Sequence, residues 1–306
     1  MKNTKPKVRL WSVLTGLTAI LTVAAIVGNI IANQYATTLN VALNASTYKI
    51  IHGENTGDTE YFKKGFASDE EREAYEAELC ATVEAEGAAL LKNENNALPL
   101  ASGAKVSLFG HGSVDLMYGG TGSGSVDTSK APNLKQALEA QGITINQTLW
   151  DLYSSDSMMS KYSRMTPASI SDTLEANTQY AVNEAPWSAL SSAESSFAEY
   201  GDAAIVVLSR SGGEGADLPS GENGTNDSWI SGQEGDGNYL ALSAEEIELL
   251  QNLKALKDNG TFKNIVVLIN SSNAIELDFL NPEICGEDYG IDAAMWIGDV
   301  GQTGIN

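Results

Sequence analysis

The stretch that most directly suggests chemistry is "LSRSGGEGADLP", residues 208–219, which places Glu214 just after the apolar run "AAIVVLS" at 203–209. A short, continuously apolar run is typical of a buried strand, and ligands bind in the loops that follow such strands. Gly213 and Gly215 let the backbone turn tightly and leave room for a ligand beside the carboxyl group. A carboxyl group in that place could act as a general acid or base. On position alone, however, an exposed loop glutamate is the simpler interpretation.

Other residues that could hold a metal do not have the required spacing. Cys80 and Cys285 lie far apart in the sequence, and His52 and His111 are isolated, so the pattern does not predict a zinc site. Acidic residues crowd the segment 217–236, but they lack the D-x-[DN]-x-[DN]-G spacing of a calcium loop. We therefore predict no metal site, and we expect two buried free thiols rather than a disulfide.

A glycine-rich segment raises the alternative of a nucleotide site. Gly110 and Gly112 directly follow the apolar run "KVSLF" at 105–109, but "SVD" comes next, so the third glycine of the dinucleotide fingerprint is missing. The segment also lacks a Gly-Lys-Ser/Thr sequence that would grip a phosphate. Close backbone packing explains these glycines better, and we predict no cofactor.

The charge of the chain restricts its partners. Its 306 residues include 18 basic and 40 acidic side chains, which gives a formal net charge of −22. Four of the basic residues precede residue 10, namely Lys2, Lys5, Lys7 and Arg9. The remainder is therefore still more acidic and repels phosphate backbones, so we predict no nucleic-acid partner. With 42% hydrophobic residues, the chain can still build a sizeable core.

The N-terminal segment predicts a membrane anchor. Residues 10–33 carry no charged side chain, and at about 1.5 Å per residue a helix of this length crosses a hydrocarbon core of about 30 Å. A cleaved signal peptide is the alternative, but the run ends in "NIIANQYATTLN" without a typical cleavage site. The basic tail at 1–9 predicts a cytoplasmic N-terminus, a single pass through the cell membrane and an extracellular folded part. Residues 34–67 have no sustained periodicity and are predicted to be a juxtamembrane linker.

The remainder, residues 68–306, predicts an α/β domain. Short apolar runs typical of parallel strands lie at 105–110, 142–146, 203–209, 264–270 and 293–298. Helical patterns with capping signals lie between or before them, at 68–87, 131–142 and 243–260. This alternation predicts a doubly wound, mostly parallel sheet with helices on both faces. The polar segment 146–200 is expected to hold two or three helices that the pattern does not place.

Taken in order, several segments resemble the sandwich domain of glycoside hydrolase family 3, which includes β-glucosidases. They are "EGAALLKNENNALPL" at 86–100, "KVSLFGHGSVDLMYGGTGSGSV" at 105–126, "AAIVVLSRSGGEGADL" at 203–218, "YLALSAEEIELLQNL" at 239–253, "NIVVLINSSNAIELDFL" at 264–280 and "AAMWIGDVGQTG" at 293–304. The resemblance spans about residues 60–306 and implies an α/β sandwich domain. Glu214 matches the acid/base glutamate of the family. The resemblance therefore favours a catalytic role for Glu214 over that of an exposed loop residue.

The resemblance implies retaining hydrolysis of a β-linked oligosaccharide or glucoside. An aspartate from a (β/α)8 barrel attacks the sugar while Glu214 protonates the leaving oxygen and then activates water, with the two carboxyl groups about 5–5.5 Å apart. To act as an acid near neutral pH, Glu214 needs a raised pKa, which burial under a bound sugar and a nearby ionised aspartate would supply. The residues expected beside the substrate are Gly213, Gly215, Asp217, Gly122 and Ser123.

Two departures from the family pattern bear on function. Only an anchor and a linker precede the sandwich domain, as in the subgroup whose barrel comes second, and the chain ends at Asn306 before any barrel. The nucleophile's aspartate motif is absent, since "TNDSW" at 225–229 has the wrong order and lies in the wrong loop. We therefore expect an incomplete sandwich domain, truncated before the barrel, that supplies the acid/base but does not hydrolyse glycosides alone. The alternative is a membrane-anchored carbohydrate-binding module without catalysis.

Overall fold

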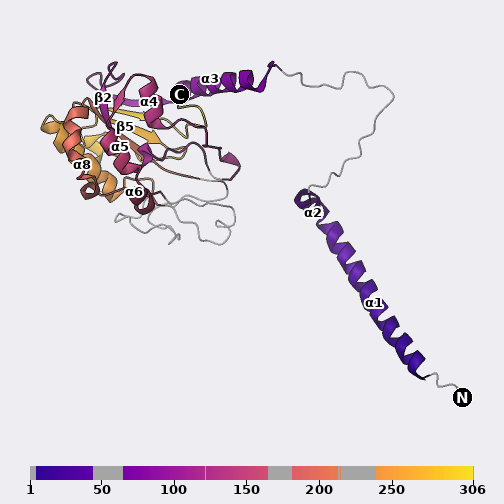
Figure 1. Cartoon of the computed structure of the whole chain (residues 1–306). Coiled ribbons are helices and arrows are strands. Elements are labelled where there is room, and N and C mark those ends of the chain that lie inside the picture. The colour runs from indigo at the N-terminus through magenta and orange to yellow at the C-terminus, as the bar shows by residue number, and fades with distance from the viewer. Residues whose placement is uncertain are drawn as a thin grey trace. The chain divides into compact units, whose positions relative to one another are not determined.

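The computed structural model describes residues 5–43, 65–120, 122–164, 181–212, 214 and 239–305. The chain forms two compact units, residues 1–65 and 66–306 (Figure 1). The described part of the first unit consists of helix α1, Lys5–Gln34, and the short helix α2, Ala36–Ala42. The α/β domain lies in the second unit.

Helix α1 contains the apolar segment that was predicted as the anchor. Residues Leu10–Gln34 are long and apolar enough to cross a membrane, with a mean hydropathy of 2.1, and a signal sequence would have the same properties. Thr15, Thr18 and Thr22 donate their hydroxyls to carbonyls four residues earlier, so these polar groups are satisfied within the helix. The domain limits stay a prediction, and α2 occupies part of the segment 34–67 that was expected to be a linker.

The second unit is built on a mixed, mostly parallel sheet (Figure 1). Its strands are β1 Ala89–Asn93, β2 Lys105–Phe109, β3 Thr144–Ile145, β4 Ala203–Ser209, β5 Ile265–Asn270 and β6 Ala293–Trp296. They lie in the order β1-β6-β5-β4-β2-β3, and every neighbouring pair is parallel except β1 with β6. The predicted α/β fold is confirmed. Strand β1 was not predicted as a strand, because its apolar residues directly follow the helical pattern at 68–87 and this edge strand is only partly covered.

Helices cover both faces of this sheet. The α-helices of the second unit are α3 Asp69–Gly87, α4 Leu134–Ala140, α5 Gln147–Tyr153, α6 Asp156–Lys161, α8 Ala244–Asp258 and α9 Pro282–Cys285. Short 3-10 helices are η1 His111–Ser113, η2 Gly122–Gly124, η3 Trp187–Leu190, η4 Glu194–Tyr200 and η6 Asp278–Leu280. Helix α8 begins with the predicted capping box, in which the side chains of Ser243 and Glu246 each accept a backbone N–H from the other residue.

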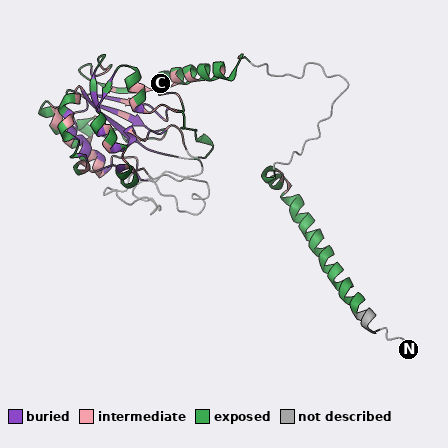
Figure 2. Ribbon diagram, viewed as in Figure 1, coloured by how far each residue is buried: buried purple, intermediate pink, exposed green. Residues whose placement is uncertain are grey.

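Two apolar cores lie on opposite faces of the sheet, because successive side chains of a strand point to opposite sides. Val206 and Leu208 of β4 pack in the core that α5 and α8 cover. Ile205 and Val207 of the same strand pack in the core that α4 covers. Buried residues are accordingly concentrated in the sheet and on the helix sides that face it (Figure 2). Strand β4 is buried along its whole length, so its carboxyl end is held rigidly by both cores.

Helix α3 differs from the amphipathic helix that was expected at 68–87. Ser68 caps its N-terminus, but Tyr75, Leu79 and Val83, which lie four residues apart on one face of the helix, are exposed. Cys80 on this helix is an exposed free thiol, so the prediction of a buried thiol is wrong there. The N-cap depends on residues close together in the sequence, so it can be predicted. Whether a helix face is buried depends on which other elements pack against it.

Candidate active site

The candidate site lies where the parallel strands β2, β4 and β5 end, and one buried amide holds these ends together. Asn270, the last residue of β5, accepts hydrogen bonds from the backbone N–H of Met117 at 2.6 Å and from the hydroxyl of Ser209 at 3.0 Å. Its amide nitrogen donates to the carbonyls of Met117 and Gly298, at 3.0 and 2.7 Å. The last residue of β4 and the segments that follow β2 and β6 are thereby fixed to β5.

Glu214 follows β4 and meets the glycine-rich segment that follows β2. The backbone N–H of Ser123 donates to Oε2 of Glu214 at 2.8 Å, and the hydroxyl of Ser123 donates to the same oxygen. Gly122 has a φ of +69°, and a Cβ added there would lie 2.7 Å from that oxygen, so only glycine suits this position. The structure therefore brings together three of the predicted site residues, from segments far apart in the sequence.

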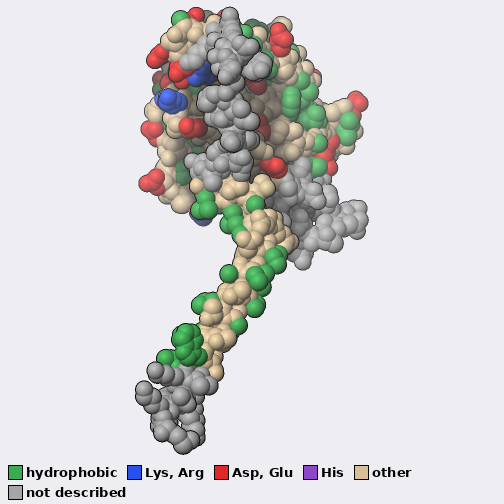
Figure 3. All heavy atoms as spheres, turned by 90° about the vertical axis from the view of Figure 1, so that its right-hand side faces the viewer, with side chains coloured by type: hydrophobic (Ala, Val, Ile, Leu, Met, Phe, Trp, Pro, Cys, Tyr) green, Lys and Arg blue, Asp and Glu red, His purple; other side chains and the backbone are tan. Residues whose placement is uncertain are grey.

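The remaining predicted site residues, Gly213, Gly215 and Asp217, lie outside the described residues. Within the described ranges, the structure holds no group of three or more His, Cys, Asp or Glu side chains that could hold a metal ion. Acidic side chains outnumber basic ones on the visible face of the second unit (Figure 3).

The pKa of Glu214 is lowered from its ordinary value in this structure. The cause is the hydroxyl of Ser123 first and its backbone N–H second, since both donate to the ionised carboxylate. Glu214 is exposed, so burial hardly opposes this effect. The group is therefore ionised at neutral pH. The raised pKa that an acid needs is not found without a bound sugar.

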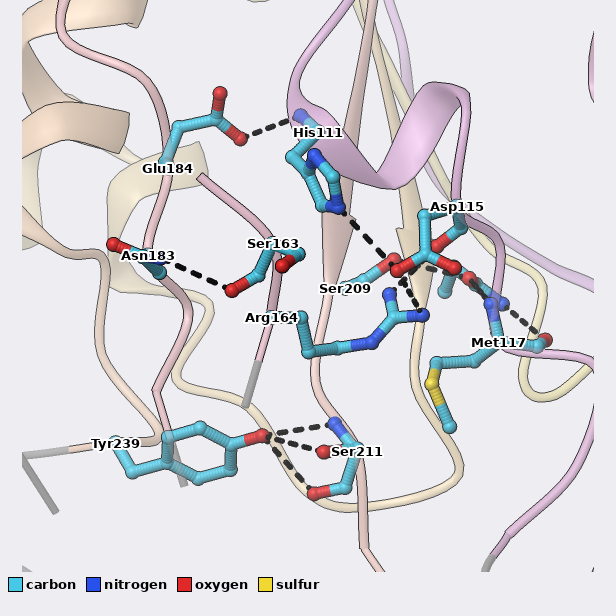
Figure 4. A network of polar contacts seen from close by, with 11 residues as sticks. His111, Asp115, Met117, Ser163, Arg164, Asn183, Glu184, Ser209, Ser211 and Tyr239 are labelled. Carbon is cyan, nitrogen blue, oxygen red and sulfur yellow. Dashed lines mark hydrogen bonds and ion pairs between the residues drawn. The ribbon is translucent and has the colours of Figure 1, made fainter. Parts of the chain in front are cut away.

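A second carboxyl group, which the sequence did not suggest, lies buried near the end of β2. Glu184 accepts the backbone N–H of His111 at 2.6 Å (Figure 4) and also that of Ala185 at 2.9 Å. Burial raises the pKa of Glu184 to about 7, although these two hydrogen bonds and nearby His111 oppose it. Its position in a polar segment without a clear pattern gave no signal of this environment.

The neighbours of Glu184 form a closed polar cluster. Arg164 pairs with Asp115 at 2.8 Å and also donates to the Asp115 carbonyl at 2.6 Å, and His111 approaches the same carboxylate at 3.3 Å (Figure 4). Although burial opposes it, the contacts with His111 and Arg164 lower the pKa of Asp115. The cavity that His111, Arg164 and Glu184 help to line is about 10 Å³, far smaller than a ligand pocket. The cavity that His111, Arg164 and Glu184 line is therefore too small to hold a sugar.

Comparison with known proteins decides the family. The family description "Glycosyl hydrolase family 3 C-terminal domain" matches residues 88–306, most of the chain. The chain belongs to this family. The resemblance seen in the sequence segments is thus confirmed.

Members of the family that resemble this chain are β-glucosidases. The chain is 34% identical over 146 residues to β-glucosidase A of Butyrivibrio fibrisolvens, a match that covers 46% of this chain and 15% of that protein. A β-glucosidase structure from Paenibacillus barengoltzii is 25% identical with a TM-score of 0.51, covering 75% of this chain and 22% of that one. β-Glucosidase 3B of Thermotoga neapolitana, solved with glucose, has the same fold at 22% identity and a TM-score of 0.53, covering 77% and 29%. The chain therefore spans less than a third of each relative.

Proposed function

We propose that this chain supplies Glu214 as the general acid/base of a retaining β-glucosidase. The observation that carries the proposal is the exposed carboxylate at the carboxyl end of β4, held by Ser123. Membership of the family and the β-glucosidase activity named for three relatives support the substrate class, a β-linked glucoside or oligosaccharide.

The proposed reaction needs Glu214 in two protonation states. In the first step its protonated form donates to the leaving oxygen, and in the second its ionised form activates water. The ionised state in which Ser123 holds Glu214 is the state that the second step needs. For the first step, a bound sugar would remove water from the carboxyl group and raise its pKa, because desolvation disfavours the charged form.

The nucleophile is proposed to come from outside residues 1–306. Retaining hydrolysis requires a second carboxyl group about 5–5.5 Å from the first. In the described part of the chain, Glu214 instead accepts two hydrogen bonds from Ser123. A barrel domain outside residues 1–306, as the family resemblance implies, would supply it, and this chain spans less than a third of each relative. Helix α1 is proposed to anchor the protein in the cell membrane with its N-terminus in the cytoplasm and the α/β domain outside.

The test uses the complete gene product, expressed with whatever coding sequence continues past codon 306. Glu214→Ala is expected to lower kcat on glucosides with poor leaving groups by about 10²–10⁴-fold, to spare the first step on 4-nitrophenyl glucoside, and to regain turnover with azide. Glu139→Ala, which changes an exposed glutamate of α4, is the control and should behave as wild type. No hydrolysis by the wild-type product, or normal hydrolysis by Glu214→Ala, would overturn the proposal.

A carbohydrate-binding module without catalysis is the second candidate. The observation that favours it is the contact of Glu214 with Ser123, which keeps the carboxyl group ionised rather than protonated. Calorimetry of the wild-type chain with glucose and cello-oligosaccharides, together with absent hydrolysis by the complete gene product, would support it. Binding that disappears in Glu214→Gln would locate the sugar at this edge of the sheet.

A further inference from the structure

A set of buried side chains joins the two ends of the segment that carries Glu214. The chain leaves β4 through Arg210 and Ser211 and returns to the described part at Tyr239. Resting on the proposed function, we infer that Arg210 and Tyr239 are positioning residues for the acid/base Glu214. Both side chains are at most 1% exposed, so neither can touch a substrate.

Arg210 holds the returning chain with its guanidinium. Nε donates to the carbonyl of Tyr239 at 2.8 Å, and Nη2 donates to the carbonyl of Ala241 at 2.6 Å. Nη1 donates to the carbonyl of Ser209 at 3.0 Å, and both terminal nitrogens bind the carboxylate of Glu246, at 2.8 and 2.7 Å. All five N–H donors of the guanidinium are thus used, which fixes its plane.

The charge of Arg210 is neutralised where it lies. Glu246 is itself buried and belongs to the capping box of α8, so the ion pair ties the end of β4 to the start of that helix. With its partner in bidentate contact, Arg210 acts on Glu214 through the position of the backbone rather than through its charge. A lysine could not fill the same five contacts, because it has three donors on a single nitrogen.

Tyr239 holds the departing chain with its hydroxyl group. That hydroxyl accepts the backbone N–H of Ser211 at 2.8 Å and donates to the carbonyl of Ser211 at 3.0 Å. Figure 4 shows the ring of Tyr239 with its hydroxyl turned toward Ser211. Tyr239 thus contacts both ends at once, through its carbonyl to Arg210 and through its hydroxyl to Ser211.

The restraint reaches Glu214 through Gly212. A Cβ added to Gly212 would lie 2.4 Å from the amide nitrogen of Asn273, so this residue packs directly on that side chain. Glu214 follows Ser211 by three residues, which span at most about 11 Å when extended. Fixing Ser211 and Gly212 therefore limits how far the carboxylate of Glu214 can move. It stays within reach of its hydrogen-bond donor Ser123.

The experiment compares Tyr239→Phe with Tyr153→Phe. Both tyrosines are 1% exposed, and the hydroxyl of Tyr153 also accepts a backbone N–H, from Gly110 at 3.2 Å. The full chain in detergent micelles, with 13C-labelled glutamate carboxyl groups, is titrated by NMR, and the resonance of Glu214 is assigned by its loss in Glu214→Gln. Tyr239→Phe is expected to raise the pKa of Glu214 toward its ordinary value, because the contact with Ser123 is populated less. Tyr153→Phe is expected to leave it unchanged.

A kinetic arm on the complete gene product tests the consequence for turnover. Tyr239→Phe should lower kcat by about tenfold or more, because small misplacements of a catalytic group are costly, with a change in KM below about twofold. Arg210→Lys is the second variant and should change the pKa of Glu214 in the same direction. The inference is overturned if both variants fold and leave the pKa of Glu214 at the wild-type value. If the wild-type product does not hydrolyse glucosides, the proposed function is wrong. The NMR titration, which does not depend on hydrolysis, still tests whether Arg210 and Tyr239 position Glu214.

Discussion

Glu184 and Glu214 both lie near the carboxyl ends of the parallel strands, but Glu184 is buried and Glu214 is exposed. Each accepts two hydrogen bonds from other groups, a type of contact that lowers a carboxyl pKa. Yet the pKa of Glu184 is raised to about 7, whereas that of Glu214 is lowered. The difference is burial: Glu184 is 5% exposed and Glu214 lies in solvent. Desolvation therefore outweighs two hydrogen bonds at this edge.

The comparison separates accessibility from acidity. Glu184 has a pKa suited to proton donation but lies in a cluster whose cavity is about 10 Å³. Glu214 is exposed and can meet a substrate, but its hydrogen bonds hold it in the ionised form. If Glu214 is the acid, a bound sugar must supply the desolvation that the protein interior supplies to Glu184. Changes on the buried side should therefore alter stability, and changes on the exposed side should alter protonation.

The largest effect is expected at the buried ion pair of Arg210 and Glu246, whose side chains are 0% and 2% exposed. Glu246→Ala leaves the guanidinium without its carboxylate, and an uncompensated buried charge costs about 3–5 kcal/mol in the free energy of unfolding. Urea denaturation of the full chain in micelles, followed by the fluorescence of tryptophans such as Trp187, which stacks on Phe109, measures the loss.

The control for this change is Glu139→Ala. Glu139 pairs with Lys135 on the surface of α4, with 44% of its side chain exposed, and should contribute at most about 0.5 kcal/mol. Similar losses in the two variants would contradict the contrast between the buried and exposed regions.

The next effect is a pH dependence that Glu184 confers. Because burial raises its pKa from 4.5 to about 7, the folded chain binds more protons than the unfolded chain between these values. Stability should therefore fall by roughly 3 kcal/mol as the pH rises through this window and then level off. Glu184→Gln should remove this part of the slope, measured as the free energy of unfolding at several pH values. Equal slopes in the variant and the wild type would show that Glu184 is not buried as a neutral acid.

The sequence predicted those features that depend on residues near one another in the chain. The buried strands predicted at 203–209 and 264–270 are found in the structure. A continuously apolar strand is stable where both of its faces are covered, and here a core covers each face. The capping box at Ser243 formed because its two partners are three residues apart. The place of Glu214, directly after such a strand, followed from the same pattern.

Features that depend on distant partners could not be predicted. Glu184 is buried by segments that are distant in the sequence, such as the one that follows β2 and contains His111. The residues next to Glu184 in the sequence give no sign of this burial. The contact between Ser123 and Glu214 joins two loops far apart in the chain. Likewise, Leu79 and Val83 of α3 have the spacing of apolar residues on a buried helix face, yet both are exposed. The spacing alone does not show whether another element packs against that face.

On the exposed side, Gly122→Ala should disturb the contact with Glu214. The residue has a φ of +69°, and its added Cβ would lie 2.7 Å from Oε2 and 2.8 Å from Cβ of Glu214. The backbone strain alone costs roughly 1–2 kcal/mol, and the displaced carboxylate should show a raised pKa in an NMR titration. Gly124→Ala is the matched control, because its Cβ would meet nothing within 4 Å. If both variants titrate alike, the glycine-rich segment does not position Glu214.

The smallest change, Ser123→Ala, tests the contact itself. It removes the hydroxyl but keeps the backbone N–H, so the pKa of Glu214 should rise while part of the lowering remains. A lowered folded pKa gives stability that is present above the unfolded pKa and is lost as the pH falls through the folded value. The variant should therefore lose less stability on acidification than the wild type, and Ser125→Ala, an exposed neighbour, should match the wild type. An unchanged titration of Glu214 in Ser123→Ala would mean that the hydroxyl does not hold the carboxylate. Glu214 would then be an ordinary exposed glutamate at rest, and any catalytic role would depend wholly on what binds above it.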